Sequence, residues 1–121
     1  MIIALDEAVS VLRKWRDERR LIQVGLISSI RSGCHVIGRI ENVDQESLRV
    51  DARSINKLGI KTGFTLEFCD AKEFRFEDWR EAPPEYSEEF RKIFEAFLFL
   101  DLGNCHCEIY AYKTGNELDP A

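Results

Sequence analysis

Four cysteines and two histidines are the residues of this 121-residue chain whose types could bind a metal or act as nucleophiles. They fall in three groups: Cys34-His35, Cys69 and Cys105-His106-Cys107. Zinc needs three or four converging ligands, and the sequence has no C-x-x-C spacing. On a strand, Cys105 and Cys107 share one face while His106 lies on the other. We therefore expect free cysteines packed as small apolar residues, with no metal, no disulfide and no cofactor.

A cysteine nucleophile needs a histidine within hydrogen-bonding reach and a third group that orients it. Adjacent strand residues point to opposite faces, so the side chains within Cys34-His35 and within Cys105-His106 point apart. A cross-strand pair such as His35 with Cys105 remains open. A metal- or thiol-dependent enzyme built on Cys34, Cys105 and Cys107 is accordingly the third functional alternative, and we do not expect an enzyme.

The charge balance excludes few functions, but it limits the kinds of binding partner that we expect. The chain has 17 Lys and Arg residues against 22 Asp and Glu residues, a net charge of -5. The acidic residues around the Pro83-Pro84 pair lack the spacing of a calcium loop. They are Glu77, Asp78, Glu81, Glu85, Glu88 and Glu89. We interpret them as a solvated acidic segment, and a polyanionic partner is not required.

One basic cluster stands out near the N-terminus. It consists of Arg13, Lys14, Arg16, Arg19 and Arg20. Leu5, Ala8, Leu12 and Trp15 precede or interleave with it at spacings of three and four, which predicts an amphipathic helix over about 5–19. Cations in the last turn of a helix are favoured by its dipole, so the cluster has a structural explanation beside a phosphate-binding one.

After the helix the apolar period changes from 3.6 to two, which predicts a series of short strands. These cover about 21–31, 36–41, 48–53, 64–68, 74–76, 95–102 and 105–111. Residues 54–63 are expected to form a loop, and residues 79–89 an irregular excursion. Residues 88–98 fit either a helix or a strand. Because Gly103-Asn104 is typical of a hairpin turn, we predict a short helix near 88–93 and a strand from about 95 to 102.

These elements predict a mainly β (α+β) fold. An N-terminal helix is followed by a small, strongly bent antiparallel β-barrel, closed or nearly closed, with a C-terminal hairpin. We expect a single domain over 1–121, with the helix at about 5–19, the barrel at about 21–112 and a polar tail at 113–121. No apolar run is long enough to span a bilayer, so a cytoplasmic protein without a membrane partner is expected.

The helix and meander resemble the first motif of the Sm-like small barrels over roughly residues 5 to 77. The pattern is Val36-x-Gly38-x-Ile40-x-x-Val43-Asp44-x-x-x-Leu48-x-Val50. In that family the glycine, here Gly38, lets the second strand bend, and the aspartate, here Asp44, ends that strand where RNA bases bind. The family's asparagine falls on Leu48, and its Arg-Gly motif has no counterpart. The chain also resembles small uncharacterised bacterial proteins.

Function is therefore expected to reside in contacts between proteins. Phe97 to Leu102 would be apolar on both faces, which favours a dimer formed through the C-terminal hairpin, in a non-enzymatic small-barrel interaction module. In the alternative that needs no dimer, the N-terminal helix covers one face of that strand within the same chain. The functional alternative is an Sm-like RNA-binding protein that uses the basic cluster and Asp44, although we do not expect a nucleic-acid partner.

Overall fold

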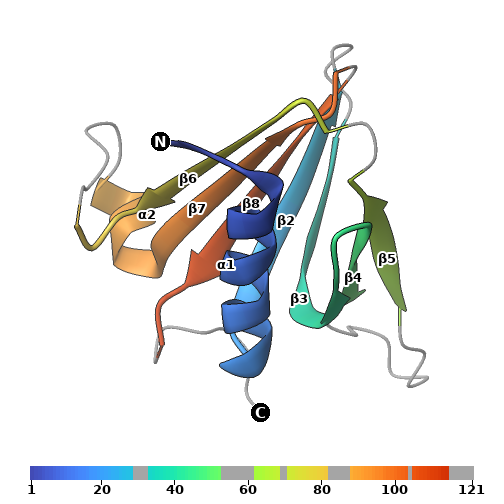
Figure 1. Cartoon of the computed structure of the whole chain (residues 1–121). Helices are drawn as coiled ribbons and strands as arrows, with labels where there is room; N and C mark the ends of the chain where they lie inside the picture. The colour runs from blue at the N-terminus through green and yellow to red at the C-terminus, as the bar shows by residue number, and fades with distance from the viewer. Residues whose placement is uncertain (29–32, 53–61, 69–70, 82–87, 104, 115–121) are drawn as a thin grey trace.

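The computed structural model describes residues 1–28, 33–52, 62–68, 71–81, 88–103 and 105–114 (Figure 1). Two helices, α1 (Leu5–Asp17) and α2 (Glu88–Ile93), accompany eight strands in this part of the chain. The strands are β1 (Ile2–Ile3), β2 (Leu21–Ser28), β3 (Gly33–Val43), β4 (Ser47–Ala52), β5 (Thr62–Glu67), β6 (Glu73–Asp78), β7 (Phe94–Asp101) and β8 (Cys105–Tyr112). All of them belong to one antiparallel sheet in the order β1-β6-β7-β8-β2-β3-β4-β5.

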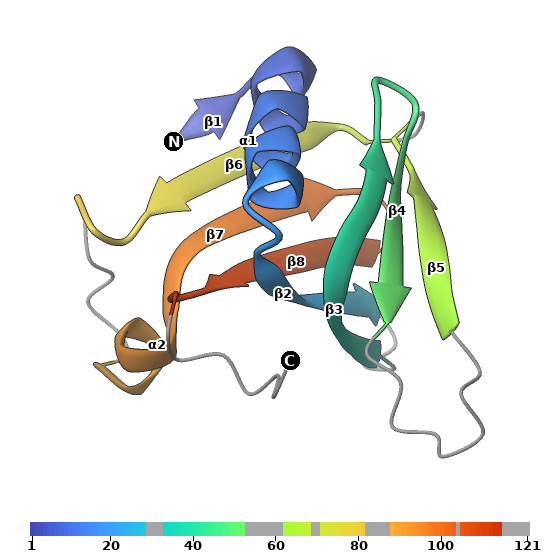
Figure 2. The same cartoon turned by 90° about the horizontal axis from the view of Figure 1, so that it is seen from below.

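The sheet curls around α1 to form a half-barrel (Figures 1 and 2). The mainly β fold with an N-terminal helix is thus confirmed. Of the two predicted forms, closed or nearly closed, a fully closed barrel is not formed, because β1 and β5 end the sheet and do not pair with each other. The apolar face of α1 packs against the concave side of the curl.

Helix α1 forms because its apolar residues recur on one face. Ala8, Val9, Leu12 and Trp15 are buried at helical spacing, and acidic residues lie in the first turn while basic residues lie in the last. The helix ends at Asp17, two residues earlier than expected. Arg19 adopts a left-handed conformation with φ of 55°, which breaks the helical path and starts the chain toward β2.

The main core lies between α1 and the concave face of the sheet. Leu12, Leu98, Leu100 and Ile109 are fully buried there. Trp15 reaches Phe76, with ring centroids 6.4 Å apart. The helix therefore covers the inward face of β7 within one chain, as predicted by the alternative that needs no dimer.

The ambiguous segment resolves as predicted, with α2 over Glu88–Ile93 followed directly by β7. Strand β7 lies between β6 and β8, so neither of its edges is free. The hairpin itself consequently offers no unpaired apolar strand, and the expected physical reason for dimerisation through it does not hold.

One strand was not predicted, and several other predictions concern segments that the structure describes only in part. The short strand β1 was missed, because two residues carry no periodicity; it pairs Ile2 with Arg75 and Ile3 with Phe74. Gly38 is buried within β3, opposite Ile22, two residues before a register shift between Ile40 and Asn42. The expected loop at 54–63, the excursion at 79–89 and the tail at 113–121 lie largely outside the described residues. Neither described helix is long and apolar enough to cross a membrane.

Gly63 in β5 is a position where no side chain fits the backbone as it stands. A Cβ there would lie 2.4 Å from the carbonyl oxygen of Val50. We expect Gly63→Ala to lower the free energy of unfolding by about 1–3 kcal/mol, the usual cost of overpacking. Thr65→Ser, an exposed change on the same strand that keeps the hydroxyl accepting from Arg49, is the control and should stay within about 0.5 kcal/mol. Urea unfolding of both variants checks this, and equal stabilities would contradict the close approach of β4 and β5.

Candidate interaction surface

A second apolar cluster lies on the outward face of the sheet, opposite the main core. Because side chains alternate along a strand, Phe97 and Phe99 project to this face while Leu98 and Leu100 project inward. We call this group the outward aromatic cluster. Its buried members are Leu21, Trp79, Phe94, Phe97 and Tyr112, and Ile37, Phe99 and Tyr110 pack against them half-buried.

The rings of the cluster contact one another closely. Ring centroids are 4.9 Å apart for Phe97 and Tyr110, 4.7 Å for Phe94 and Tyr112, and 6.2 Å for Trp79 and Phe97. Tilted and offset pairs at these distances are the favoured arrangements of aromatic rings. The cluster is therefore a packed platform rather than a set of mobile side chains.

Helix α2 lies on this platform, outside the curl that holds α1 (Figure 2). Phe90 stacks on Tyr110 with centroids 5.9 Å apart and planes at 11°, and it also stacks on Phe94 at 6.0 Å. No residue of α2 is buried, and Phe90 and Ile93 are 41% and 40% exposed. Spacing of three places both side chains on the same side of the helix. This pair is the apolar part of the candidate surface.

The polar residues of α2 are ordered by charge along the helix. Glu88 and Glu89 occupy the first turn, and Arg91 and Lys92 occupy the last. Arg91 lies 3.9 Å from Glu88 at the limit of an ion pair, which has little energy at an exposed site. The surface thus combines two exposed apolar side chains with an acidic end and a basic end.

The predicted basic cluster divides into four residues near the surface of the helix and one largely buried residue, Arg20. Arg13 and Lys14 are exposed, and Arg16 donates to the neighbouring Asp17 at 3.1 Å. Arg19 adopts the left-handed conformation at the end of α1, and its carbonyl oxygen accepts a hydrogen bond from Arg39 Nε at 3.0 Å.

Arg20 has a structural environment. Its side chain is only 10% exposed and forms an ion pair with Glu95, which is 16% exposed. The same guanidinium donates to the Tyr112 carbonyl oxygen at 2.9 Å and to Glu18 at 3.0 Å. These acceptors join the end of α1 to β7 and β8, so Arg20 is already paired within the chain and cannot present its full charge to a phosphate.

Asp44 is the first residue of the turn between β3 and β4. Its Oδ1 accepts hydrogen bonds from the backbone N–H groups of Glu46 at 2.8 Å and Ser47 at 2.9 Å. These two donors hold the pKa of the Asp44 carboxyl below its ordinary value, with a smaller contribution from the charge of Arg13. The aspartate closes the turn, and Leu48, four residues later on β4, is fully buried in the core.

This arrangement predicts a pH dependence. A carboxyl whose pKa is lowered by folding contributes stability above its ordinary pKa of 3.8, and that stability is lost as the pH falls through the lowered value. Asp44→Asn should therefore be less stable than the wild type at neutral pH, and the difference should shrink below pH 3.8. Thermal unfolding at pH 7 and at pH 2.5 measures this; a difference that stays constant would contradict the role of the charged form.

The thiols and histidines that the structure describes do not gather into a cluster of three or more possible ligands. Cys107 is fully buried in the main core, and Cys105 is a half-buried free thiol; Cys69 and the Cys34 side chain lie outside what the structure describes. His35 opposes Gly25 and Cys105 opposes Ser28, so these two side chains lie on opposite faces of the sheet. His106 lies 3.5 Å from Glu108. Among the described residues, no three His, Cys, Asp or Glu side chains gather where they could hold a metal ion.

Comparisons of the chain with protein-family models, with curated proteins and with solved structures found no match. The resemblance to small barrels is therefore carried by the architecture alone: a helix followed by a strongly curled antiparallel half-barrel.

Proposed function

We propose that this chain is a non-enzymatic interaction module of the cytoplasm that forms a homodimer through α2 and the outward aromatic cluster. The observation that carries the proposal is α2 itself: a helix without a buried residue that exposes Phe90 and Ile93 between an acidic and a basic end. Exposed aromatic residues packed on a rigid platform are characteristic of protein interfaces.

Charge order favours a second copy of the chain as the partner. If two α2 helices pack antiparallel about a twofold axis, Glu88 and Glu89 of one copy face Arg91 and Lys92 of the other. In that register Phe90 lies opposite its own counterpart at the twofold axis, and Ile93 lies about one helical turn away from the axis. A partner of uniform charge would be attracted at one end of α2 and repelled at the other. Self-association thus satisfies the apolar and the charged residues together.

Replacing the two exposed apolar residues tests this proposal. We expect Phe90→Ser with Ile93→Ser to convert the dimer into a monomer, because the centre of the interface would lose its apolar contact. The matched control is Ile2→Ser, which removes an even more exposed apolar side chain from β1 and should leave the dimer intact. Sedimentation equilibrium at micromolar concentration measures both. A wild-type chain of monomeric mass, or a double variant that still dimerises, would refute the role of α2.

The Sm-like RNA-binding alternative has less support. Its six residues are Arg13, Lys14, Arg16, Arg19, Arg20 and Asp44. Arg20 is paired inside the chain, and Asp44 accepts backbone hydrogen bonds within its own turn. For the third alternative, a metal- or thiol-dependent enzyme, no three His, Cys, Asp or Glu side chains gather around Cys105 or Cys107 in the described part of the chain. Neither alternative therefore replaces the dimer as our proposal.

A further inference from the structure

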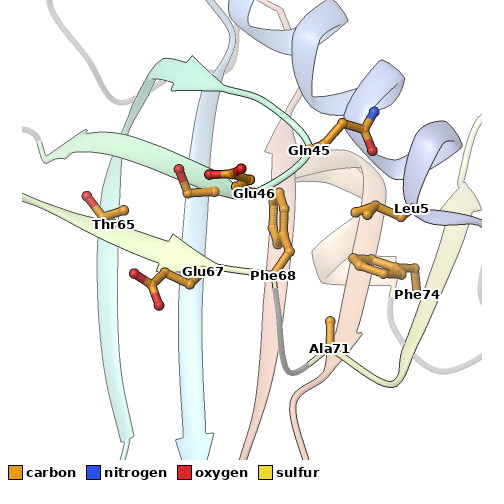
Figure 3. Close-up of a pocket in the computed structure, with 9 residues that line it drawn as sticks. Leu5, Gln45, Glu46, Thr65, Glu67, Phe68, Ala71 and Phe74 are labelled. Atoms are coloured by element: carbon orange, nitrogen blue, oxygen red, sulfur yellow. The ribbon is translucent and has the colours of Figure 1, made fainter.

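The half-barrel has a cavity at the seam where its two ends fail to meet. Its volume is about 700 Å³, and it lies between the first turn of α1, the turn from β3 to β4, the end of β5 and the start of β6 (Figure 3). The lining residues are Leu5, Gln45, Glu46, Ser47, Thr65, Glu67, Phe68, Ala71 and Phe74. This site is separate from the outward aromatic cluster.

Backbone hydrogen bonds fix the walls of the cavity. The N–H of Phe68 donates to the Glu46 carbonyl oxygen at 2.8 Å, and the N–H of Ala71 donates to the Phe68 carbonyl oxygen at 2.9 Å. Phe68 and Phe74 are almost fully buried and meet edge to face, with centroids 6.0 Å apart. Two segments from opposite ends of the sheet are thereby held beside the cavity, so it exists before any ligand arrives.

The two sides of the cavity differ in character. Leu5, Phe68, Ala71 and Phe74 form an apolar side, and Figure 3 shows them gathered next to α1 and β6. On the opposite side, β4 and β5 and the turn before them contribute hydroxyl and carboxylate groups. Glu46 and Glu67 are both exposed there, and no Lys, Arg or His is among the described residues that line the cavity. Arg49, outside this lining, donates to the Thr65 hydroxyl at 3.4 Å.

We propose that this seam cavity binds a small organic ammonium ion with an apolar body. A volume of about 700 Å³ lies within the usual range for small-molecule sites, which are mostly apolar with a few polar groups that fix orientation. The apolar body packs against Leu5, Phe68 and Phe74. The ammonium group faces Glu46 and Glu67, whose negative charges attract a cation.

Three probes of nearly equal size separate charge from shape. They are 2-phenylethylammonium, neutral 2-phenylethanol and anionic 3-phenylpropionate. Titration of the wild-type protein followed by amide chemical shifts should show the ammonium binding about tenfold more tightly than the alcohol, and the carboxylate binding most weakly. Shifts should centre on Thr65, Ala71 and Phe74.

Variants then assign the preference to the two carboxylates. Glu46→Gln with Glu67→Gln should bring the ammonium to the affinity of the alcohol while leaving the alcohol unchanged. The control is Glu81→Gln, an exposed change away from the cavity that should keep the full preference. Since the dimer variant with Phe90→Ser and Ile93→Ser leaves the seam untouched, it should bind the ammonium as the wild type does.

Three results would overturn the proposal. One is equal binding of ammonium and alcohol by the wild type. Another is the absence of shifts around the cavity at millimolar ammonium. The third is tighter binding of a lysine-containing peptide than of 2-phenylethylammonium, which would assign the seam to a protein partner instead of a small molecule.

Discussion

Leu12→Ala is expected to lower the free energy of unfolding by about 3–5 kcal/mol, the range for a leucine removed from a packed core. Leu12 is fully buried on α1, in the cluster that includes Leu98, Leu100 and Ile109 of the sheet. The side chains packed around Leu12 are expected to relax only partly into the space left by the lost side chain. The cavity should therefore persist.

Urea unfolding followed by tryptophan fluorescence measures this effect, since Trp15 lies on the same helix face. Ser10→Ala is the matched control: Ser10 is exposed on α1, and its replacement should change stability by no more than about 0.5 kcal/mol. If both variants lost the same small amount, α1 would not form the centre of the core.

Arg20→Ala is expected to cost about 3 kcal/mol, because removing one partner of a largely buried ion pair leaves the other charge without compensation. Glu95 is the partner left behind, and the Tyr112 carbonyl oxygen also loses a donor. Replacing both charged residues, Arg20→Met with Glu95→Leu, should recover much of the loss, because no unpaired charge remains.

Lys14→Ala provides the comparison within the same basic cluster. Lys14 is exposed, so its removal should stay within about 0.5 kcal/mol. Thermal unfolding of the four proteins measures the contrast. An Arg20→Ala variant as stable as Lys14→Ala would contradict the structural role assigned to Arg20.

Local patterns in the sequence predict most of the strands. Alternation places Val36, Ile40, Leu48 and Val50 on strands without knowledge of their partners, and the structure confirms those strands. The hairpin signal at Gly103-Asn104 correctly predicts that β7 ends just before it and that β8 follows. Neither β1 nor the open seam has a local signal. The first is two residues long, and the second depends on where the ends of an eight-stranded sheet come to lie.

The candidate surface was only partly predictable. Sequence periodicity locates the helix at 88–93, and the spacing of Phe90 and Ile93 was visible there. It could not show that β7 is paired at both edges and covered on its inward face within the chain, because that depends on β6, β8 and α1, which are distant in sequence. Arg20 was grouped with exposed cations for the same reason: its partner Glu95 lies 75 residues away.

A charge-exchange experiment on α2 tests the central claim most directly. One variant carries Glu88→Lys and Glu89→Lys, and the other carries Arg91→Glu and Lys92→Glu. In an antiparallel dimer each variant would place like charges opposite each other, whereas a mixture would pair opposite charges along the whole helix.

Sedimentation equilibrium of each variant and of their equimolar mixture provides the measurement. The account predicts monomers for each variant alone and a heterodimer for the mixture. Dimers of either variant alone, or a mixture that stays monomeric while the wild type dimerises, would contradict an interface built on two antiparallel α2 helices.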